Sequence, residues 1–383
     1  MTSGRPAGAG ASPSRMQAAL PKHWYVDDDH WRRERDVVLY NSWLCVGRLD
    51  ELGLVSPSRL AVVDVAGESI LVTRDADGGL HGAYNVCRHR GSQIIPLTDD
   101  VDTPVCQPAQ ALRCPYHSWT YDLSGRLLRA PHTDGVDDFD PADFALTPVA
   151  VAAWRGFCFV HLTPAEATDL TADLVDFGAR LARYPLESLV VGRRYDYEVR
   201  ANYKVLLENF NECYHCGPVH PELTRLVPAF GGGGVDLDWD SGVPHRADAW
   251  TFTMTGTTTR APFPDLDANE RTRHKGELIY PNLLLSCSAD HVMALALWPT
   301  ATDRTRVTCE LLFAPDEAAR DDFDPDDAAE LWDLVNRQDW AICESVQRGM
   351  SSRAYRQGWF APSEDWSADI RRWLVPRLEG LDG

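Results

Sequence analysis

The sequence predicts an α+β protein: a small all-β domain, then a larger domain in which a curved antiparallel sheet grips a long C-terminal helix. Three observations support this. Short β-like runs separated by turn residues fill Arg59 to Leu162. Longer β-like runs follow, and Pro325 to Met350 has the pattern of a long helix. With 383 residues and 44% hydrophobic content, the chain is long enough for two cores.

The chain divides into four expected parts. Met1 to Arg15 is rich in Gly, Ala, Ser and Pro and lacks the apolar stretch of a signal peptide, which favours a disordered leader. The expected boundaries are residues 1–20 for the leader, 21–58 for an N-terminal helical segment, 59–163 for the all-β domain (core 42–163) and 164–383 for the second domain.

In the first half, His30 to Leu49 carries apolar residues on a charged background, which predicts a helix. Ala61 to Val65 and Ser69 to Thr73 flank a Gly-bearing turn. Asp75 to Gly79 forms a second turn before Leu80 to Val86, and this spacing predicts hairpins.

In the second half, Pro164 to Tyr184 is expected to be a helix at the domain boundary, because Leu170, Leu174 and Phe177 recur at helical spacing. Strong helices are predicted at Tyr203 to His215 and at Pro325 to Met350. The expected strands are Val190 to Ala201, Ala249 to Thr257, Gly276 to Ser288, His291 to Pro299 and Thr305 to Ala314.

Composition excludes several classes of function. The net charge of −20 disfavours nucleic-acid binding, which requires clustered Lys and Arg. The sequence has no apolar run of about 18 residues, so we expect no membrane span. The ten Cys form no disulfide framework, which fits a reducing cytoplasm.

Two cysteine–histidine pairs form the most informative motif. Cys87 and His89 give C-x-H, and Cys114 and His117 give C-x-x-H. Two thiolates for one iron and two imidazoles for the other are the ligands of a Rieske [2Fe–2S] cluster. A Cys2His2 zinc site would use the same ligand types and is the alternative.

The surrounding residues favour the cluster. Residues 89–91 and 114–119 resemble the two cluster-binding loops of Rieske domains, and residues 154–160 resemble the closing strand. The stretch between the two pairs is longer than is usual there, and Thr98 to Gln110 is expected to be an inserted acidic loop. Cys106 lies in it, but no His follows at ligand spacing, so we leave Cys106 out of the site.

A second candidate metal site follows in the chain. On a continuous helix, Glu208, Glu212 and His215 share one stripe, and the Gly217-Pro218 pair would end the helix so that His220 can turn back. Two imidazoles and a carboxylate form the facial triad of non-haem Fe(II) oxygenases. The alternative is a pair of His residues placed at a helix terminus by the helix dipole.

The two motifs together resemble the catalytic α subunit of Rieske non-haem iron oxygenases over nearly the whole chain. The resemblance implies that His215 and His220 bind iron, and that the third ligand is an Asp on the C-terminal helix. Asp339 falls at that position. Its alternative role is an ordinary solvated carboxylate, because Asp333 and Glu344 lie on the same helix.

The resemblance also implies catalytic roles for Glu212 and Asn209. Most members have Asp where this chain has Glu212, and that residue bridges an iron ligand and the cluster ligand of the next subunit, here His215 and His117. Glu at this position, and Tyr203 in place of the usual Trp, resemble the branch that oxidises choline, carnitine, glycine betaine and proline betaine.

The fold implied for the second domain is the helix-grip (START/Bet v 1-like) fold. The implied cofactors are one Rieske [2Fe–2S] cluster and one mononuclear Fe(II) per subunit, with NAD(P)H acting only through a separate flavin- or ferredoxin-type reductase. The implied activity is O2-dependent oxidation, with N-demethylation of a betaine-like small molecule favoured. The implied assembly is a homotrimer.

Other functions stay open at this point. The alternatives are an aromatic ring-hydroxylating dioxygenase or O-demethylase, a Rieske electron carrier, and a zinc-stapled binding protein. A methylated cation would need aromatic ring faces. The candidates in the second domain are Trp239, Trp250, Phe252, Phe263, Tyr280 and Trp298.

Overall fold

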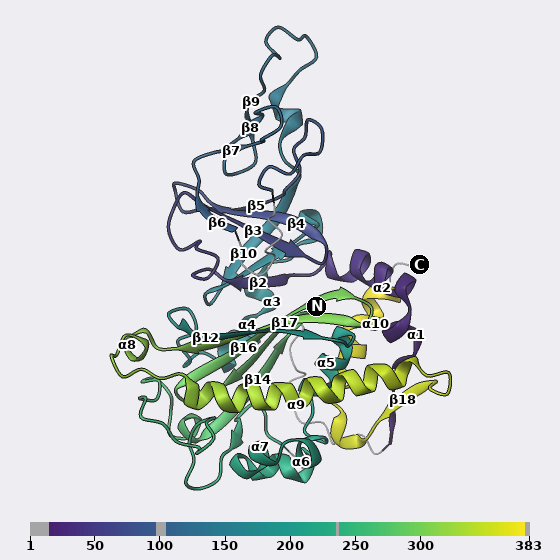
Figure 1. Cartoon of the computed structure of the whole chain (residues 1–383), viewed down its shortest axis with the longest axis vertical. Coiled ribbons are helices and arrows are strands. Elements are labelled where there is room, and N and C mark those ends of the chain that lie inside the picture. Colours follow the sequence, from purple (N-terminus) through teal and green to yellow (C-terminus); the bar gives the residue numbers. More distant parts are fainter. Residues whose placement is uncertain (1–14, 97–104, 235–236, 380–383) are drawn as a thin grey trace. The chain divides into compact units, whose positions relative to one another are not determined.

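The computed structural model describes residues 15–96, 105–234 and 237–379 (Figure 1). The chain forms two compact units: Leu39–Leu170, and Met1–Val38 together with Thr171–Gly383. No helix within these described ranges has both the length and the apolar character needed to cross a membrane. All ten cysteines are free thiols.

The smaller unit contains a seven-stranded antiparallel sheet and a three-stranded sheet. In the first, β3 (Arg59–Val65) and β4 (Glu68–Arg74) form a tight hairpin, whose turn residues Ala66 and Gly67 have positive φ, as a two-residue hairpin turn requires. The large sheet has the order β2 (Leu44–Arg48), β11 (Phe157–His161), β10 (Pro148–Trp154), β5 (Leu80–Tyr84), β4, β3, β6 (Val105–Pro108). The small sheet comprises β7 (Leu112–Arg113), β8 (Thr120–Tyr121) and β9 (Leu127–Arg129).

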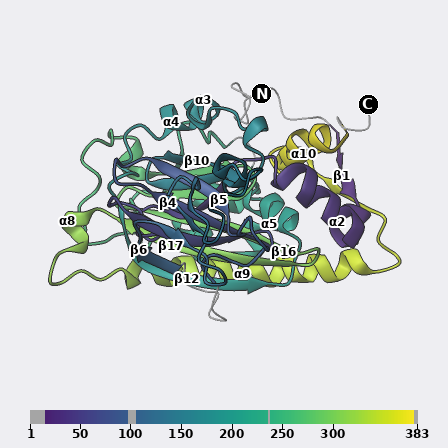
Figure 2. The same ribbon diagram turned by 90° about the horizontal axis from the view of Figure 1, so that it is seen from above.

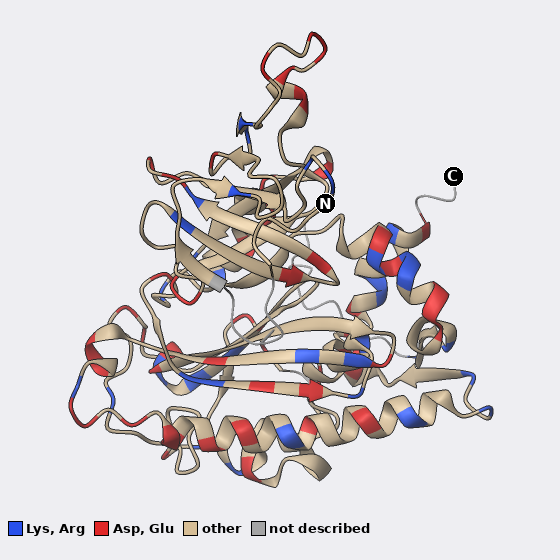
Figure 3. Cartoon of the chain, turned by 45° about the horizontal axis from the view of Figure 1, so that its top comes forward, with Lys and Arg blue, Asp and Glu red and all other residues tan. Residues whose placement is uncertain are grey.

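The larger unit is built on a curved six-stranded antiparallel sheet. Helix α9 (Asp326–Ser351) runs beside it, as Figures 1 and 2 both show, and its contacts with the sheet are made chiefly with β12. Acidic and basic residues both occur along α9 (Figure 3), and apolar residues such as Leu331, Trp332 and Val335 are buried. The strand order is β12 (Val190–Val199), β17 (Arg304–Phe313), β16 (His291–Ala301), β15 (Leu283–Cys287), β14 (Arg273–Ile279), β13 (Val243–Pro244).

Short elements complete the two units. The smaller unit carries the 3₁₀ turns η2 (Pro141–Phe144) and η3 (Pro164–Glu166). The larger unit carries α5 (Tyr203–Phe210), which packs against α9. Its other short elements are α4 (Val175–Arg180), α6 (Cys216–Val219), α7 (Pro221–Leu226), η4 (Pro228–Gly232), η5 (Glu270–Thr272), α8 (Pro315–Ala318), η6 (Pro362–Glu364) and α10 (Asp369–Glu379), and α3 (Leu170–Asp173) begins at the boundary.

The N-terminal segment differs from the prediction in two places. Residues 17–20, assigned to the leader, belong to strand β1 (Gln17–Pro21), which pairs with β18 (Gln357–Phe360) and buries Ala19 and Leu20. The predicted helix from His30 to Leu49 ends earlier. The short helix α1 (His23–Val26) comes first, followed by α2 (Asp28–Glu34) and the π-helical turn η1 (Arg35–Leu39). The end of the predicted helix is instead strand β2, which pairs with β11.

Other element predictions also need correction. The single strand expected at Gly276 to Ser288 is two strands, β14 and β15, joined by a turn at Pro281. The strand expected at Ala249 to Thr257 is a series of turns, because Thr253 Oγ1 donates to the Thr257 carbonyl and so competes with strand pairing. The helix expected at Pro164 to Tyr184 is divided into η3, α3 and α4.

Candidate functional site

The first candidate site is built from two similar loops of the smaller unit. In one, the backbone N–H of Gly91 donates to the carbonyl of Cys87 (3.0 Å). In the other, the N–H of Ser118 donates to the carbonyl of Cys114 (3.1 Å). Ser118 has a positive φ, so the second loop turns as sharply as the glycine allows the first to turn. The two predicted ligand pairs therefore lie on loops with the same local turn.

The two cysteines and the two histidines lie at different depths. Cys87 and Cys114 are each only 2% exposed, whereas His89 is exposed and His117 is partly exposed. The imidazole centroids of His89 and His117 are 4.6 Å apart, and the His89 ring stacks on Trp119 at 5.0 Å. Buried thiols with outward imidazoles fit a cluster whose inner iron has sulfur ligands and whose outer iron has nitrogen ligands.

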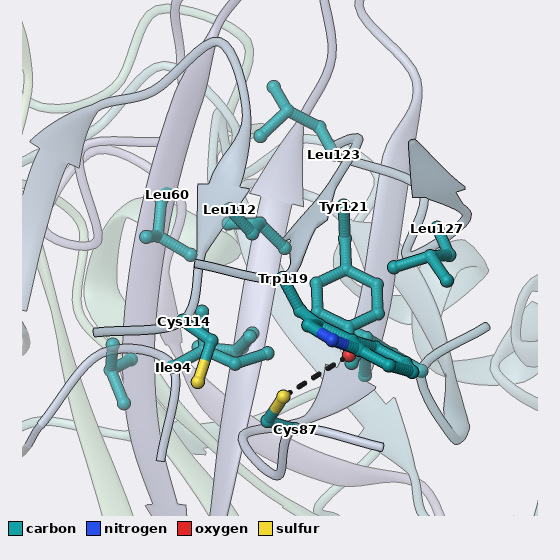
Figure 4. Close-up of a cluster of buried hydrophobic side chains, with 13 residues drawn as sticks. Leu60, Cys87, Ile94, Leu112, Cys114, Trp119, Tyr121, Leu123 and Leu127 are labelled. Atoms are coloured by element: carbon teal, nitrogen blue, oxygen red, sulfur yellow. Dashed lines mark hydrogen bonds between the residues drawn. The ribbon is translucent and has the colours of Figure 1, made fainter. Parts of the chain in front are cut away.

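A tyrosine that the sequence analysis missed supports the first loop. The Tyr121 hydroxyl lies 3.3 Å from Cys87 Sγ (Figure 4). The same hydroxyl accepts the backbone N–H of Arg88. Hydrogen bonds to cluster sulfurs help to set the reduction potential. The only signal in the sequence was its place four residues after the candidate ligand His117. The core around it comprises Leu60, Val62, Leu71, Ala83, Ile94, Leu112, Trp119, Leu123, Leu127 and Leu146.

Cys106 lies apart from these loops. It sits on β6, and its sulfur accepts a hydrogen bond from the Arg59 guanidinium (2.9 Å). The expected inserted loop, Thr98 to Gln110, is therefore partly a strand, because residues 105–108 pair with β3. Residues 97–104 lie outside the described residues.

The second candidate site joins three elements of the larger unit. His215 lies just before α6, His220 lies between α6 and α7, and Asp339 lies on α9. The continuous helix predicted from Tyr203 to His215 is wrong, because α5 ends at Phe210. The predicted shared stripe is therefore also wrong. Glu208 points elsewhere and accepts a hydrogen bond from the Tyr25 hydroxyl (2.5 Å).

The three candidate ligands converge on one point. The Nε2 atoms of His215 and His220 are 3.1 Å apart, and Asp339 Oδ1 lies 3.2 Å from the first and 2.9 Å from the second. Ligand atoms about 2.1 Å from a metal and at right angles to each other are about 3 Å apart. The spacing and the donor set therefore fit a facial triad.

Two side chains orient the imidazoles. Glu212 Oε1 accepts from His215 Nδ1 (2.5 Å), and Gln338 Oε1 accepts from His220 Nδ1 (2.7 Å). Each bond leaves Nε2 free to coordinate a metal, as outer hydrogen-bond partners do in metal sites. Gln338 was missed by sequence reasoning, although its position next to Asp339 was a signal.

The electrostatics of this site favour a cation. Burial alone would lower the pKa of His215, but hydrogen bonds with Asp339 and Glu212 raise it to about 11. Burial alone would raise the pKa of Asp339, but hydrogen bonds with His215 and His220 lower it. The predicted catalytic Asn209 also lies here, with Nδ2 3.3 Å from His215 Nε2.

A cavity of about 90 Å³ adjoins the three candidate ligands. Of the predicted aromatic residues, Trp239 and Phe252 line it, whereas Trp250, Phe263, Tyr280 and Trp298 lie outside its lining. Prediction missed four further rings because they come from separate elements. They are Phe210, Phe230, Trp332 and Trp340.

Comparison with known proteins identifies both domains. Residues 186–380 match the family described as ring hydroxylating alpha subunit (catalytic domain), and residues 42–140 match the Rieske [2Fe-2S] domain. The chain is 30% identical over 408 residues to the glycine betaine monooxygenase oxygenase subunit of Chromohalobacter salexigens, covering 94% of this chain and 87% of that protein.

Two further similarities concern carnitine enzymes. The carnitine monooxygenase oxygenase subunit of Acinetobacter pittii is 28% identical over 342 residues, covering 88% of this chain and 86% of that protein. The structure of the quaternary ammonium Rieske monooxygenase CntA in complex with L-carnitine matches with a TM-score of 0.70 and 25% identity, covering 94% and 96% of the two chains. The protein is therefore an oxidoreductase that belongs to the ring-hydroxylating α-subunit family of Rieske non-haem iron oxygenases.

Proposed function

We propose that this protein is the terminal oxygenase that oxidises an N-methyl group of a quaternary ammonium compound of the betaine and choline type. The observation that carries the proposal is the triad of His215, His220 and Asp339 beside a cavity lined with aromatic rings. Aromatic faces attract alkylated cations. The glycine betaine and carnitine oxygenase subunits among the relatives support the same substrate class.

The two domains of this family imply a Rieske cluster and a non-haem iron. We propose Cys87, His89, Cys114 and His117 for the first, and the triad for the second. When bound, the iron activates O2 and the cluster supplies single electrons. In the balanced reaction, the N-methyl group, O2, two electrons and two protons give an N-hydroxymethyl group and one water. The hydroxymethyl product then breaks its C–N bond to give the tertiary amine, formaldehyde and a proton.

The protein's own residues prepare this reaction. Glu212 and Gln338 fix the imidazole tautomers, so that both Nε2 atoms face the same point. Glu212 Oε2 accepts the backbone N–H groups of Tyr214 and His215, which holds the carboxylate in place. The apolar rings of the cavity exclude water and hold the substrate near the triad.

The oxygenase-subunit relatives imply a separate reductase and O2 as partners. We propose that the reductase uses NAD(P)H and is of the flavin or ferredoxin type. We also propose a homotrimer in which electrons pass between subunits towards Glu212, an idea supported by the inter-subunit electron transfer described for a related quaternary ammonium monooxygenase. The ten free thiols suit a reducing cytoplasm.

The test is O2 uptake and formaldehyde release by the iron-replete protein with NADH and a surrogate reductase. The panel would contain betaines, choline, carnitine and methoxylated or plain aromatic acids. Formaldehyde formed in step with O2 use on an N-methylated compound is the expected result. Coupled O2 uptake on the aromatic acids alone would instead assign the protein to aromatic oxidation.

A further inference from the structure

One end of the cavity lies well away from the candidate iron ligands. Trp332 and Asp339 are seven residues apart on α9, so they share a face and are separated by about 10 Å along the helix axis. Phe252 stacks on Trp332 with ring centroids 5.0 Å apart, and His274 stacks on Phe252 at 4.1 Å. These three rings, all lining the cavity, are here called the distal wall.

Of the three side chains in the distal wall, only His274 has a polar atom that is not already hydrogen-bonded within the protein. The indole N–H of Trp332 donates to His291 Nε2 (2.9 Å), and His291 Nδ1 donates to Asp290 (3.0 Å). The Trp332 donor is therefore occupied. By contrast, neither ring nitrogen of His274 has a hydrogen-bond partner among the described residues. Nδ1 is buried, whereas the residue lines the cavity and is 5% exposed, so Nε2 is the nitrogen that a ligand can reach. A polar atom in such a site requires a partner.

The imidazole of His274 is uncharged. Burial, with His245 and His291 nearby, lowers its pKa well below the usual range. A neutral imidazole has one N–H donor and one acceptor nitrogen. It can therefore bond to a hydroxyl in either direction, but it brings no positive charge to balance a carboxylate.

The residues that line the cavity in the described structure include no Lys or Arg that could supply that charge at the distal wall. Lys275 follows His274 on β14, but strand alternation turns it to the opposite face, where it pairs with Glu270 (2.8 Å). Arg260, behind the wall, pairs with Asp290 (2.8 Å). A carboxylate placed at the wall would be desolvated without a cationic partner, which is costly.

We propose that the distal wall binds an uncharged, hydroxyl-bearing end of the N-methylated substrate through His274, so that the preferred substrates are amino alcohols of the choline type rather than amino-acid betaines. This rests on the proposed function and narrows its substrate class. The rings of Phe252 and Trp332 cover the alkyl part of the substrate, and the His291–Asp290 pair fixes the orientation of Trp332.

The test compares ligands that are matched in length and differ in charge at the far end. Calorimetry on protein loaded with iron and cluster would measure Kd for choline against glycine betaine, and for (4-hydroxybutyl)trimethylammonium against γ-butyrobetaine. Each alcohol is expected to bind at least about tenfold tighter than its carboxylate. Equal or tighter binding of the carboxylates would overturn the proposal. If none of the four bound, the proposed function itself would fail, and this inference with it.

A variant separates hydrogen bonding from ring packing. His274→Phe keeps an aromatic ring in the stack and should weaken binding of the hydroxybutyl compound by about fivefold to tenfold. Binding of butyltrimethylammonium, which lacks the hydroxyl, should not change.

His274→Gln retains a hydrogen-bonding group, so it should keep the preference for alcohols. It also serves as the test if the Phe variant does not fold. His245→Phe is the matched control, because His245 packs behind Phe252 and does not line the cavity. An unchanged alcohol affinity in His274→Phe would remove His274 from recognition.

Discussion

At the scale of single residues, the second candidate site depends on hydrogen bonds behind the ligands as much as on the ligands. Glu212 and Gln338 each hold one imidazole by its Nδ1 atom. Glu212 also accepts two backbone N–H groups through its other oxygen. The extra methylene of Glu, compared with the Asp usual in the family, gives the carboxylate the reach to contact both the ring and the backbone.

Glu212→Gln tests this arrangement. The amide keeps the shape of the side chain but loses the negative charge that accepts the His215 N–H, so ring orientation and electron delivery should suffer. We expect iron content and cluster absorbance to stay normal while coupled turnover falls by about 10- to 100-fold, the range for outer partners of metal ligands. Metal analysis, visible spectra and the ratio of product to O2 consumed would measure this. Wild-type turnover would remove Glu212 from the electron path.

Tyr121→Phe tests the first site. Removal of the hydroxyl takes away the hydrogen bond at 3.3 Å from Cys87 Sγ. The reduced cluster carries more negative charge, so it loses more stabilisation than the oxidised form. The reduction potential should therefore fall by on the order of 40 mV, which corresponds to about 1 kcal/mol for one electron. Redox titration with Tyr84→Phe as the control checks this, because the Tyr84 hydroxyl donates to the Leu162 carbonyl instead. An unchanged potential in Tyr121→Phe would mean that the contact has no electronic role.

At the scale of elements, helices and strands with strong local patterns were predicted well. Element ends that depend on side-chain hydrogen bonds with the backbone were not. The β3–β4 hairpin and α9 follow directly from alternation, turn residues and helical spacing. The end of α5 at Phe210 does not, because nothing in the periodicity of residues 203–215 shows that Glu212 would bind backbone N–H groups beyond the helix. The predicted shared face of Glu208 and His215 failed for this reason.

The side chain of Glu208 shows what α5 does instead. It is buried, and burial raises its pKa to about 8 despite the hydrogen bond from Tyr25 and the nearby Lys204. Between about pH 4.5 and pH 8 the folded chain therefore holds a proton that the unfolded chain releases. The contribution of Glu208 to stability should therefore fall as pH rises through this window, by up to about 5 kcal/mol.

Glu208→Gln mimics the protonated side chain at every pH. We expect the variant to be as stable as the wild type near pH 4.5 and more stable near pH 8, so the difference in free energy of unfolding should grow with pH. Chemical unfolding at several pH values measures this difference and cancels the other titrating groups. A difference that does not vary with pH would show that Glu208 is ionised in the folded protein across this range.

At the scale of the whole molecule, the candidate metal ligands and the substrate cavity differ in how far they could be predicted. Six of the seven candidate ligands lie in compact motifs such as residues 87–89 and 114–117, so spacing identifies them as candidates. Asp339 lies far along the chain, and only the family resemblance pointed to it. The distal wall combines a turn, a strand and a helix through Phe252, His274 and Trp332. No local pattern links these residues, so only the folded structure shows that their rings stack.

The proposed trimer makes a prediction that no single chain can test. The variant Asp339→Ala should keep the cluster but lose the iron, and His117→Ala should keep the iron but lose the cluster. Each should be inactive alone. If electrons cross between subunits, a cyclic trimer containing both variants has one productive junction out of three, so its turnover should be about one third of the wild-type value. Co-expression with two affinity tags and tandem purification isolates these mixed oligomers, and native mass spectrometry confirms their composition. Mixed trimers without activity would mean that each electron stays within the subunit whose cluster it entered.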